Sequence, residues 1–274
     1  KHVTVALSGD GADELFAGYR RYKLHLNEDH LRRWLPLAIR KPIFGLLGKI
    51  YPKLDWAPRF LRAKTTFQSL ALDTVAGYHN SIAILRKDQR DRLFSDAFKK
   101  RLNGYNSLEV FRRYGDKVKH LDPMKIAQYL DMKTYLVGDI LTKVDRASMA
   151  HSLEVRVPFL DHKFVEWAFT AESSANLQNG IGKFSLKRAL EPHLPNDVLY
   201  RKKMGFAVPL SQWFRGPLQQ KLEQKLLSDV MVNSGYFNVG ELKKLIDDHK
   251  TAIKDNSAIL WTLLMFAAFL ERNS

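Results

Sequence analysis

The stretch HVTVALSGDGADE, residues 2–14, decides the expected fold. Residues 3–7 are apolar and rich in β-branched side chains, a composition typical of a strand buried on both faces of a parallel sheet. The run ends at SGDG, residues 8–11, which favours a tight turn, and residues 12–22 are compatible with a helix. The sequence therefore predicts a strand, a turn and a helix in succession.

Helices dominate the expected structure after this point, because no comparable apolar run follows. Asp122, followed by Pro123, predicts the N-cap of a long helix that runs to about Met149. Residues 155–161 are expected to be extended, and Asp161 to cap a further helix over residues 162–169. The expected fold class is mainly α with one strand near the N-terminus, and we expect the rest of the sheet to lie outside this chain.

The last third of the chain predicts a short helix over residues 184–190, a loop over residues 204–209 and an apolar helix over residues 258–270. The apolar stretch is shorter than the roughly 20 residues that a membrane-spanning helix needs. We therefore expect residues 258–270 to form a buried terminal helix.

The turn after the first strand combines two glycines, a hydroxyl group and three carboxylates within residues 8–14. Glycines let a backbone approach a ligand closely, and the free amides of a helix N-terminus favour an anion such as phosphate. The carboxylates fit this picture if Mg²⁺ bridges them to phosphates. The alternative is a capped helix whose acidic residues complement its dipole, and the pattern leaves both interpretations open.

Basic side chains gather around the expected loops between residues 183 and 203. A cation just ahead of the MGF sequence at residues 204–206 suits a transferring phosphate or a departing pyrophosphate. The alternative is a solvated basic surface. Asp139 and Lys143 are four residues apart, and for them we expect only an ion pair along a helix. The basic set is Lys183, Lys187, Arg188, Arg201, Lys202 and Lys203.

The chain has 44 Lys and Arg against 29 Asp and Glu, a formal net charge of +15, which favours an anionic partner such as a nucleotide, a nucleic acid or an acidic membrane. The excess is densest in residues 23–64, which hold ten basic and three acidic residues. No RNA- or DNA-binding motif accompanies it, so no nucleic-acid partner is expected. For residues 31–60 we expect a buried apolar face with solvated arginines at its edge; the alternative is a non-enzymatic helical module on an anionic membrane surface.

The chain contains no cysteine, which excludes disulfides, cysteine nucleophiles and thiolate metal sites and fits a reducing, cytoplasmic location. The nine histidines show no metal-ligand spacing. The sequence also lacks the Gly-x-Ser-x-Gly and Gly-x-x-x-x-Gly-Lys-Ser/Thr motifs. Hydrolases built on a nucleophile elbow and P-loop nucleotidases are therefore poor candidates.

Three motifs, in order, resemble the C-terminal synthetase domain of glutamine-dependent asparagine synthetase. They are SGDGADELFAGY at residues 8–19, KVDRASM with EVRVPFLD at residues 143–149 and 154–161, and RKKMGF at residues 201–206. The resemblance implies that residues 1–274 are the helical C-terminal part of an α/β ATP-pyrophosphatase domain of the adenine nucleotide alpha hydrolase type. Within it, residues 1–22 would form the nucleotide motif, residues 23–120 a divergent helical segment, and residues 121–274 the part with the catalytic lysine.

The resemblance also implies a reaction and roles for single residues. In this family ATP activates the side-chain carboxylate of aspartate as an acyl-adenylate, and ammonia derived from glutamine then displaces AMP. Ser8, Gly9 and Gly11 would contact the nucleotide. Asp10 would help form the adenylate and handle the proton during amide formation, although many members have glutamate at this position. Asp13 would bind Mg²⁺.

Two lysines match family positions on the phosphate side of the reaction. Lys203 would stabilise the adenylate and its transition states, and Lys183 would contact pyrophosphate. The family's glutaminase domain, with its N-terminal cysteine, and its Ser-Gly-Gly-Leu-Asp-Ser pyrophosphate loop do not occur in these residues. We therefore expect the chain alone to be inactive. Relatives that act on another carboxylate, in polysaccharide or β-lactam pathways, provide an alternative function.

Overall fold

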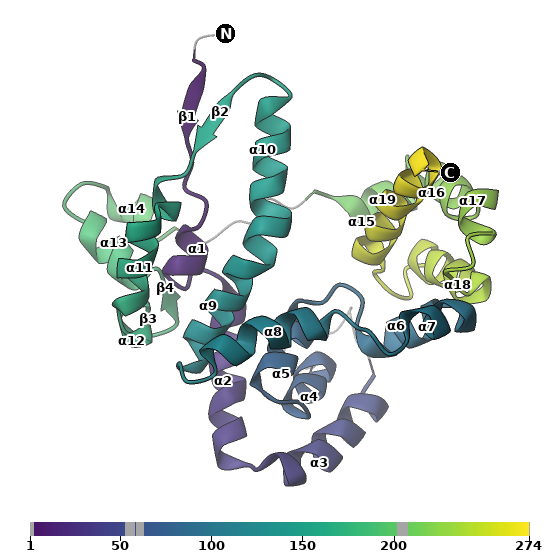
Figure 1. Cartoon of the computed structure of the whole chain (residues 1–274), viewed down its shortest axis with the longest axis horizontal. Helices are drawn as coiled ribbons and strands as arrows, with labels where there is room; N and C mark the ends of the chain where they lie inside the picture. The colour runs from purple at the N-terminus through teal and green to yellow at the C-terminus, as the bar shows by residue number, and fades with distance from the viewer. Residues whose placement is uncertain (1–2, 53–57, 59–62, 202–207, 274) are drawn as a thin grey trace. The chain divides into compact units, whose positions relative to one another are not determined.

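The structure, a computed structural model, describes residues 3–52, 58, 63–201 and 208–273. It is mainly helical, as expected (Figure 1). The strand near the N-terminus, β1 (Val5–Leu7), pairs in parallel with β2 (Glu154–Arg156), which lies in the segment expected to be extended. A second pair, β3 (Leu177–Gln178) and β4 (Ile181–Gly182), is antiparallel. The described strands thus form two separate two-stranded sheets, one parallel and one antiparallel.

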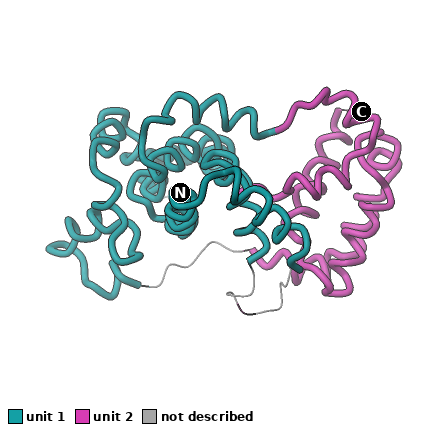
Figure 2. Tube along the Cα trace, turned by 90° about the horizontal axis from the view of Figure 1, so that it is seen from below, with its two compact units in different colours: residues 1–52, 63–81, 107–203 teal, residues 53–62, 82–106, 204–274 magenta. Residues whose placement is uncertain are grey.

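The chain divides into two compact units (Figure 2). Unit 1 comprises residues 1–52, 63–81 and 107–203, and unit 2 comprises residues 53–62, 82–106 and 204–274. Besides the four strands, unit 1 holds α1 (Ala12–Leu15), α2 (Arg20–Trp34), α3 (Leu37–Ile50), α4 (Lys64–Leu70), α5 (Thr74–Ile82), α8 (Leu108–Val118), α9 (Pro123–Lys133), the π-helix η2 (Leu136–Leu141), α10 (Thr142–Met149), the 3₁₀-helix η3 (Pro158–Leu160), α11 (His162–Thr170), α12 (Ser173–Asn176), α13 (Phe184–Leu190) and α14 (Asn196–Leu199).

The first strand is exposed rather than buried, so that expectation is wrong. Val3 is 61% exposed and Leu7 is 74% exposed. Among the described residues β1 has one neighbouring strand, β2, and no helical layer covers both of its faces. An apolar strand is buried only when other elements supply those layers.

The helix expected over residues 12–22 is interrupted. α1 ends at Leu15 and α2 begins at Arg20, with Ala17 in the left-handed region at φ 54°. The backbone N–H of Lys183 donates to the Phe16 carbonyl oxygen at 2.7 Å. A distant segment therefore satisfies the end of α1, which local sequence does not reveal.

Both predicted caps are confirmed. The Asp122 side chain accepts hydrogen bonds from the N–H groups of Met124 and Lys125, and Asp161 caps α11 in the same way. The helix expected to run to Met149 is however divided into α9, η2 and α10. The break lies at Thr134, whose φ and ψ of −129° and −75° are not helical.

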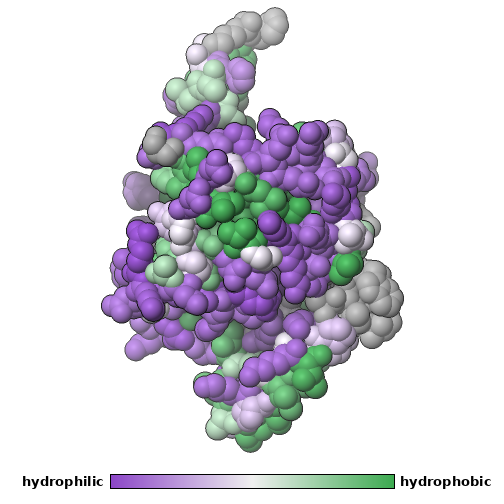
Figure 3. Space-filling model, turned by 90° about the vertical axis from the view of Figure 1, so that its right-hand side faces the viewer, coloured by the Kyte–Doolittle hydropathy of each residue, from purple (hydrophilic) through white to green (hydrophobic). Residues whose placement is uncertain are grey.

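The expectation for residues 31–60 is reversed in the described part of that segment. Arg32 and Arg40 are 7% and 6% exposed, whereas the apolar side chains of Trp34, Ile39 and Ile43 are exposed. Figure 3 shows apolar side chains gathered at the bottom of the view, where Figure 1 places α3. The physical reason is hydrogen bonding, because both guanidinium groups donate to backbone carbonyls at or just beyond the end of α4. The last carbonyls of a helix lack the N–H group one turn ahead, which leaves them open to such donors, although the Ser69 carbonyl also accepts the Leu72 N–H at 3.1 Å.

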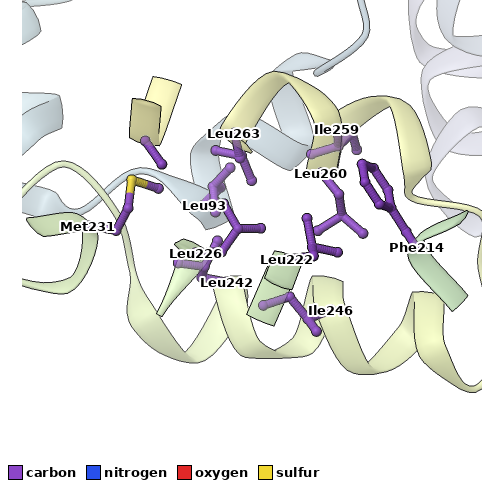
Figure 4. Packing of buried hydrophobic residues seen from close by; sticks show 11 residues of the cluster. Leu93, Phe214, Leu222, Leu226, Met231, Leu242, Ile246, Ile259, Leu260 and Leu263 are labelled. Carbon is purple, nitrogen blue, oxygen red and sulfur yellow. The ribbon is translucent and has the colours of Figure 1, made fainter. Parts of the chain in front are cut away.

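Unit 2 is built around a separate apolar core (Figure 4). Its helices are α6 (Lys87–Leu93), α7 (Asp96–Leu102), α15 (Leu210–Arg215), α16 (Gln219–Leu226), α17 (Asp229–Val232), α18 (Val239–Lys250) and α19 (Ser257–Asn273). The terminal helix α19 buries Leu260 and Leu263 in this core but exposes Trp261 and Phe269, so it is only half buried. No helix in the described part of the chain is long and apolar enough to cross a membrane.

Candidate active site

The loop at the carboxyl end of β1, residues 8–11, lies against the segment that follows β2. The Ser8 N–H donates to the Arg156 carbonyl oxygen at 2.9 Å and so extends the parallel ladder. Gly11 has φ 84°, and a Cβ atom there would lie 2.4 Å from Leu160 Cδ2. Two of the three motifs are therefore in direct contact, at the carboxyl ends of parallel strands, where open α/β sheets bind ligands.

Ser8 and Asp10 hold each other within this loop. The Ser8 hydroxyl donates to Asp10 Oδ2 at 2.5 Å, and both residues are half-buried. Gly9 between them is exposed, and a Cβ atom there would meet nothing within 4 Å. The loop thus presents an oriented carboxylate beside an open stretch of backbone.

Asp13 and Lys183 are far apart in the sequence but lie close together in the structure. Lys183 Nζ lies 3.3 Å from Asp13 Oδ2, and both side chains remain about one-quarter exposed. Lys183 has φ 58° and stands immediately before α13. Its neighbour Gly182 is pressed so closely on the turn after α1 that a Cβ atom would lie 2.3 Å from the Ala17 carbonyl oxygen. The β3–β4 hairpin therefore places Lys183 beside α1.

Glu14 is a buried carboxyl group of the first motif whose role the sequence pattern does not indicate. It is 1% exposed and accepts a hydrogen bond from the Tyr19 hydroxyl at 2.8 Å. Burial raises the pKa of Glu14 above its usual range, and burial together with the neighbouring Glu14 charge raises the pKa of Tyr19. Tyr19 therefore remains a hydrogen-bond donor at neutral pH.

Gln128 of α9 donates hydrogen bonds to the C-terminal end of α1. Its side chain is fully buried, and its Nε2 donates to the carbonyl oxygens of Glu14 and Leu15 at 2.5 and 2.9 Å. A helix of four residues leaves such carbonyls without partners, so a side chain must supply the donors. The available sequence signal is a polar residue among the apolar residues of α9.

Asp131, also on α9, ties three helices of unit 1 together. Its Oδ2 accepts hydrogen bonds from Tyr22 and Tyr78 at 2.6 Å each and forms an ion pair with Arg21 at 2.8 Å. The Arg21 guanidinium lies 3.9 Å from the centre of the Tyr19 ring. This cluster positions the start of α2, and hence the tyrosine that contacts Glu14.

The chain matches the asparagine synthase family over residues 1–271. It belongs to this family. It is 31% identical over 273 residues to asparagine synthetase (glutamine-hydrolyzing) 1 of Bacillus subtilis (strain 168), covering 97% of this chain and 40% of that protein. Asparagine synthetase (glutamine-hydrolyzing) 3 of the same organism is 28% identical over 54% of this chain and 28% of its own length.

A more distant relative has a different name. It is amidase chyE of Penicillium rubens (strain ATCC 28089 / DSM 1075 / NRRL 1951 / Wisconsin 54-1255), 22% identical over 89% of this chain and 38% of its own length. No solved structure shows a significant match. Nearly the whole chain aligns with asparagine synthetase 1 of Bacillus subtilis, but it spans only about two-fifths of the length of that protein. Membership of the asparagine synthase family confirms the resemblance seen in the three motifs.

The third asparagine synthase motif is only partly placed. Lys202, Lys203 and the loop expected over residues 204–209 lie outside the described residues, except for its last two positions, and Arg201 is exposed. Two other members of the basic set have neighbours of their own, since Lys187 lies 5.2 Å from the centre of the Tyr200 ring and Arg188 pairs with Glu191.

Asp139 and Lys143 are exposed, and no ion pair joins them within the described part of the chain. The π-helical segment that contains Asp139 changes the spacing on which an i, i+4 pair depends. The expected surface pair is therefore not formed.

The oxygen donors of this loop are too few to hold a magnesium ion without ligands from a substrate. The described residues contain no group of three or more His, Cys, Asp or Glu side chains that could hold a metal ion. Mg²⁺ is usually bound by one or two carboxylates together with substrate phosphates. The partly exposed carboxylate of Asp13 at the start of α1, with that of Asp10 in the loop before it, fits that limited requirement.

Proposed function

We propose that the protein containing this chain is an ATP-dependent amide-forming ligase of the asparagine synthetase type. Residues 1–274 would form the C-terminal part of its synthetase domain, with the nucleotide motif in residues 1–22, a divergent segment in 23–120 and the catalytic lysine in 121–274. The observation that supports this proposal best is the contact between Asp13 and Lys183 beside the glycine loop. It joins a carboxylate suited to Mg²⁺ and a cation suited to pyrophosphate, both assigned by the family resemblance.

The first step would activate the acid. A carboxylate oxygen of aspartate attacks the α-phosphorus of ATP, an O–P bond forms, and the bond to pyrophosphate breaks. Ser8, Gly9 and Gly11 would contact the nucleotide through the loop backbone, which glycine leaves open to a ligand. Lys183 would meet the departing pyrophosphate and stabilise its developing charge.

The second step would form the amide. Ammonia attacks the acyl carbon, a C–N bond forms, and AMP leaves with the electron pair of the C–O bond. Asp10 would accept the proton that nitrogen releases, and its hydrogen bond with Ser8 orients it for this task. Lys203 would stabilise the adenylate and the charge in both transition states.

Mg²⁺ would neutralise part of the phosphate charge when it is bound. Asp13 would supply one ligand oxygen, and the nucleotide phosphates most of the others. The same carboxylate lies 3.3 Å from Lys183 Nζ, so the proposed metal ligand and the proposed pyrophosphate contact are neighbours. Ammonia would come from a glutaminase domain outside these residues.

A second candidate function keeps the adenylation but changes the acceptor acid. It is favoured by the similarity to a protein named an amidase and by the basic, aromatic stretch over residues 31–60. The acceptor would then be another carboxylate, as in polysaccharide or β-lactam pathways. The residues assigned to ATP would keep their roles, because the acid that attacks the α-phosphorus would change while the nucleotide would not.

Product identification with the full-length protein separates these candidates. The protein is given ATP, Mg²⁺, glutamine and aspartate or a panel of other acids, and products are identified by mass spectrometry. We expect asparagine, AMP and pyrophosphate in equal amounts. A different amide with no asparagine would support the second candidate, and failure to release AMP with any acid would overturn both. Residues 1–274 alone are expected to show no aspartate-dependent exchange between ATP and pyrophosphate.

A further inference from the structure

The turn between α1 and α2 contacts the side chains of both Asp13 and Lys183. The Gly18 N–H donates to the Asp13 carbonyl oxygen at 2.8 Å. A Cβ atom on Gly18 would overlap Asp13 Oδ1 and lie 2.5 Å from Lys183 Cε. The carboxylate and the lysine side chain therefore lie against the bare Cα atom of Gly18, and a side chain at this position would displace them.

The backbone that carries the lysine contacts the same turn. The Lys183 N–H donates to the Phe16 carbonyl oxygen at 2.7 Å, and a Cβ atom on Gly182 would overlap the Ala17 carbonyl oxygen. Ala17 has φ 54°, a conformation that residues other than glycine keep only where their surroundings impose it. The path of the chain from Phe16 to Gly18 thus determines where both side chains of the proposed phosphate site lie.

A side-chain hydrogen bond closes this turn. The Tyr19 hydroxyl donates to Glu14 Oε1 at 2.8 Å, and Glu14 is 1% exposed. Because Glu14 follows Asp13 and Tyr19 follows Gly18, this bond joins the two ends of the turn beside the backbone bond from Gly18 to Asp13. Removing the donor of a buried hydrogen bond is costly, since the acceptor stays desolvated without its partner. The bond therefore favours the closed turn.

The ring of Tyr19 is held in place by contacts that do not involve its hydroxyl group. The guanidinium carbon of Arg21 lies 3.9 Å from the centre of the Tyr19 ring and 4.6 Å from that of Tyr135. Arg21 in turn forms an ion pair with the buried Asp131. These contacts direct the hydroxyl toward Glu14, and a phenylalanine ring could keep them.

We propose that Tyr19 is a positioning residue for Asp13, because its hydrogen bond to Glu14 holds Gly18 against the Asp13 carboxylate and so orients that carboxylate toward a metal ion. This inference rests on the proposed function, which assigns Asp13 to Mg²⁺ bound together with ATP. Partners that orient a metal ligand typically change metal affinity or activity by about 10- to 100-fold when they are removed. Tyr19 itself would touch neither the metal nor the nucleotide.

Binding of ATP with Mg²⁺ to the full-length protein tests the proposal without turnover. Calorimetric titration gives the Kd in a solution that contains neither aspartate nor glutamine. Tyr19→Phe keeps the ring beside Arg21 but removes the hydroxyl, and it should weaken binding by about tenfold. The matched control is Tyr135→Phe, which removes a hydroxyl from the other ring beside Arg21, leaves the bond to Glu14 in place and should leave the Kd unchanged. Thermal unfolding and glutamine hydrolysis check that each variant folds.

A double-mutant cycle separates the positioning of Asp13 from a general effect on the fold. Asp13→Asn should weaken binding of ATP with Mg²⁺ by about 10- to 100-fold. Adding Tyr19→Phe to Asp13→Asn should then cost little more, because the hydroxyl acts through a carboxylate that is already lost. A purely structural role of Tyr19 would instead make the two losses multiply.

Two further variants test the turn and its hydrogen bond directly. In Gly18→Ala the nearest atoms to the new methyl group belong to two flexible side chains, so the protein should fold, but Asp13 must move and the affinity should fall by about tenfold or more. Glu14→Gln keeps an oxygen acceptor for Tyr19 and should retain most of the affinity. A loss in Glu14→Gln as large as that in Tyr19→Phe would overturn the proposal, because the charge of Glu14 would then matter rather than the bond.

Other outcomes would also overturn the proposal. They are an unchanged affinity in Tyr19→Phe or in Gly18→Ala, and losses that multiply in the cycle. An unchanged affinity in Asp13→Asn would remove the metal assignment of Asp13 and this inference with it. Failure of the proposed reaction is a separate result, because it is measured by product formation. A protein that forms the amide but whose Tyr19→Phe variant binds ATP with Mg²⁺ normally would refute only this inference.

Discussion

Lys183 Nζ lies 3.3 Å from the Oδ2 atom of Asp13, although the two residues belong to segments at opposite ends of unit 1 in sequence. The contact depends on a glycine before the lysine, a left-handed backbone at Lys183 itself and a hydrogen bond from its N–H to Phe16. None of these features is needed for a surface ion pair, which is worth little by itself. They indicate that the local structure holds Lys183 in this position.

Replacing Lys183 tests its proposed contact with pyrophosphate. Lys183→Ala in the full-length enzyme should lower kcat/KM for ATP by about 10²- to 10³-fold, because a cation is lost where charge develops. Steady-state pyrophosphate release measures the effect. Arg188→Ala removes a nearby cation from an exposed pair with Glu191 and should change the rate less than twofold. A similar loss in both variants would indicate a non-specific effect of charge.

Lys203 provides a prediction from the family motif alone. Lys203→Ala in the full-length protein should reduce amide formation by about 10²-fold or more and leave glutamine hydrolysis largely intact, since the proposed role of the lysine is to stabilise the adenylate. Both activities are measured on the same preparation, by product analysis and by glutamate release. Equal loss of the two activities would point to misfolding instead.

Gly11 tests the packing of the loop on the segment after β2. Gly11→Ala places a methyl group within reach of Leu160 and forces a side chain onto a residue with φ 84°. We expect a loss of more than about 1 kcal/mol in the free energy of unfolding, together with a raised KM for ATP. Urea unfolding and ATP titrations measure the two effects. Gly9→Ala, at a position with open space and an unstrained φ, is the matched control and should cost little stability.

His25 makes stability depend on pH. It is 2% exposed, neither ring nitrogen has a partner among the described residues, and burial, aided by the charge of Arg32, lowers its pKa to about 3. The unfolded chain binds a proton near pH 6.5 and the folded chain does not, so this contribution to stability is present above pH 6.5 and is lost as pH falls toward 3.

The isosteric variant His25→Leu should remove that dependence. Between pH 6.5 and pH 5 the parent should lose about 2 kcal/mol more of its free energy of unfolding than the variant loses. Urea unfolding at a series of pH values measures the difference. Parallel curves for the two proteins would contradict the assignment of a neutral, buried imidazole.

Several local features were predictable because their partners lie close in sequence. The caps at Asp122 and Asp161 bond to N–H groups two and three residues ahead. The glycine loop after β1 was predictable for the same reason, because neighbouring residues determine it. The three motifs were enough to indicate the family. The helical class likewise follows from periodicity along the chain.

The reversal on α3 was not predictable in this way. Periodicity separates one side of a helix from the other, but it does not say which side a neighbour covers. Arg40 reaches carbonyl groups about 30 residues further on, and these bonds decide that the arginine is buried and the isoleucines are exposed.

The sequence by itself determined the family, the helical class, the capped helices and the identity of the candidate site residues. Only the tertiary structure decided that α1 ends at Leu15, that Gln128 supports it and that Lys183 stands beside Asp13. The physical reason is the range of the interactions. Caps and turns are satisfied within a few residues, whereas the carbonyls of a short helix and the charge of a loop carboxylate find their partners more than 100 residues away.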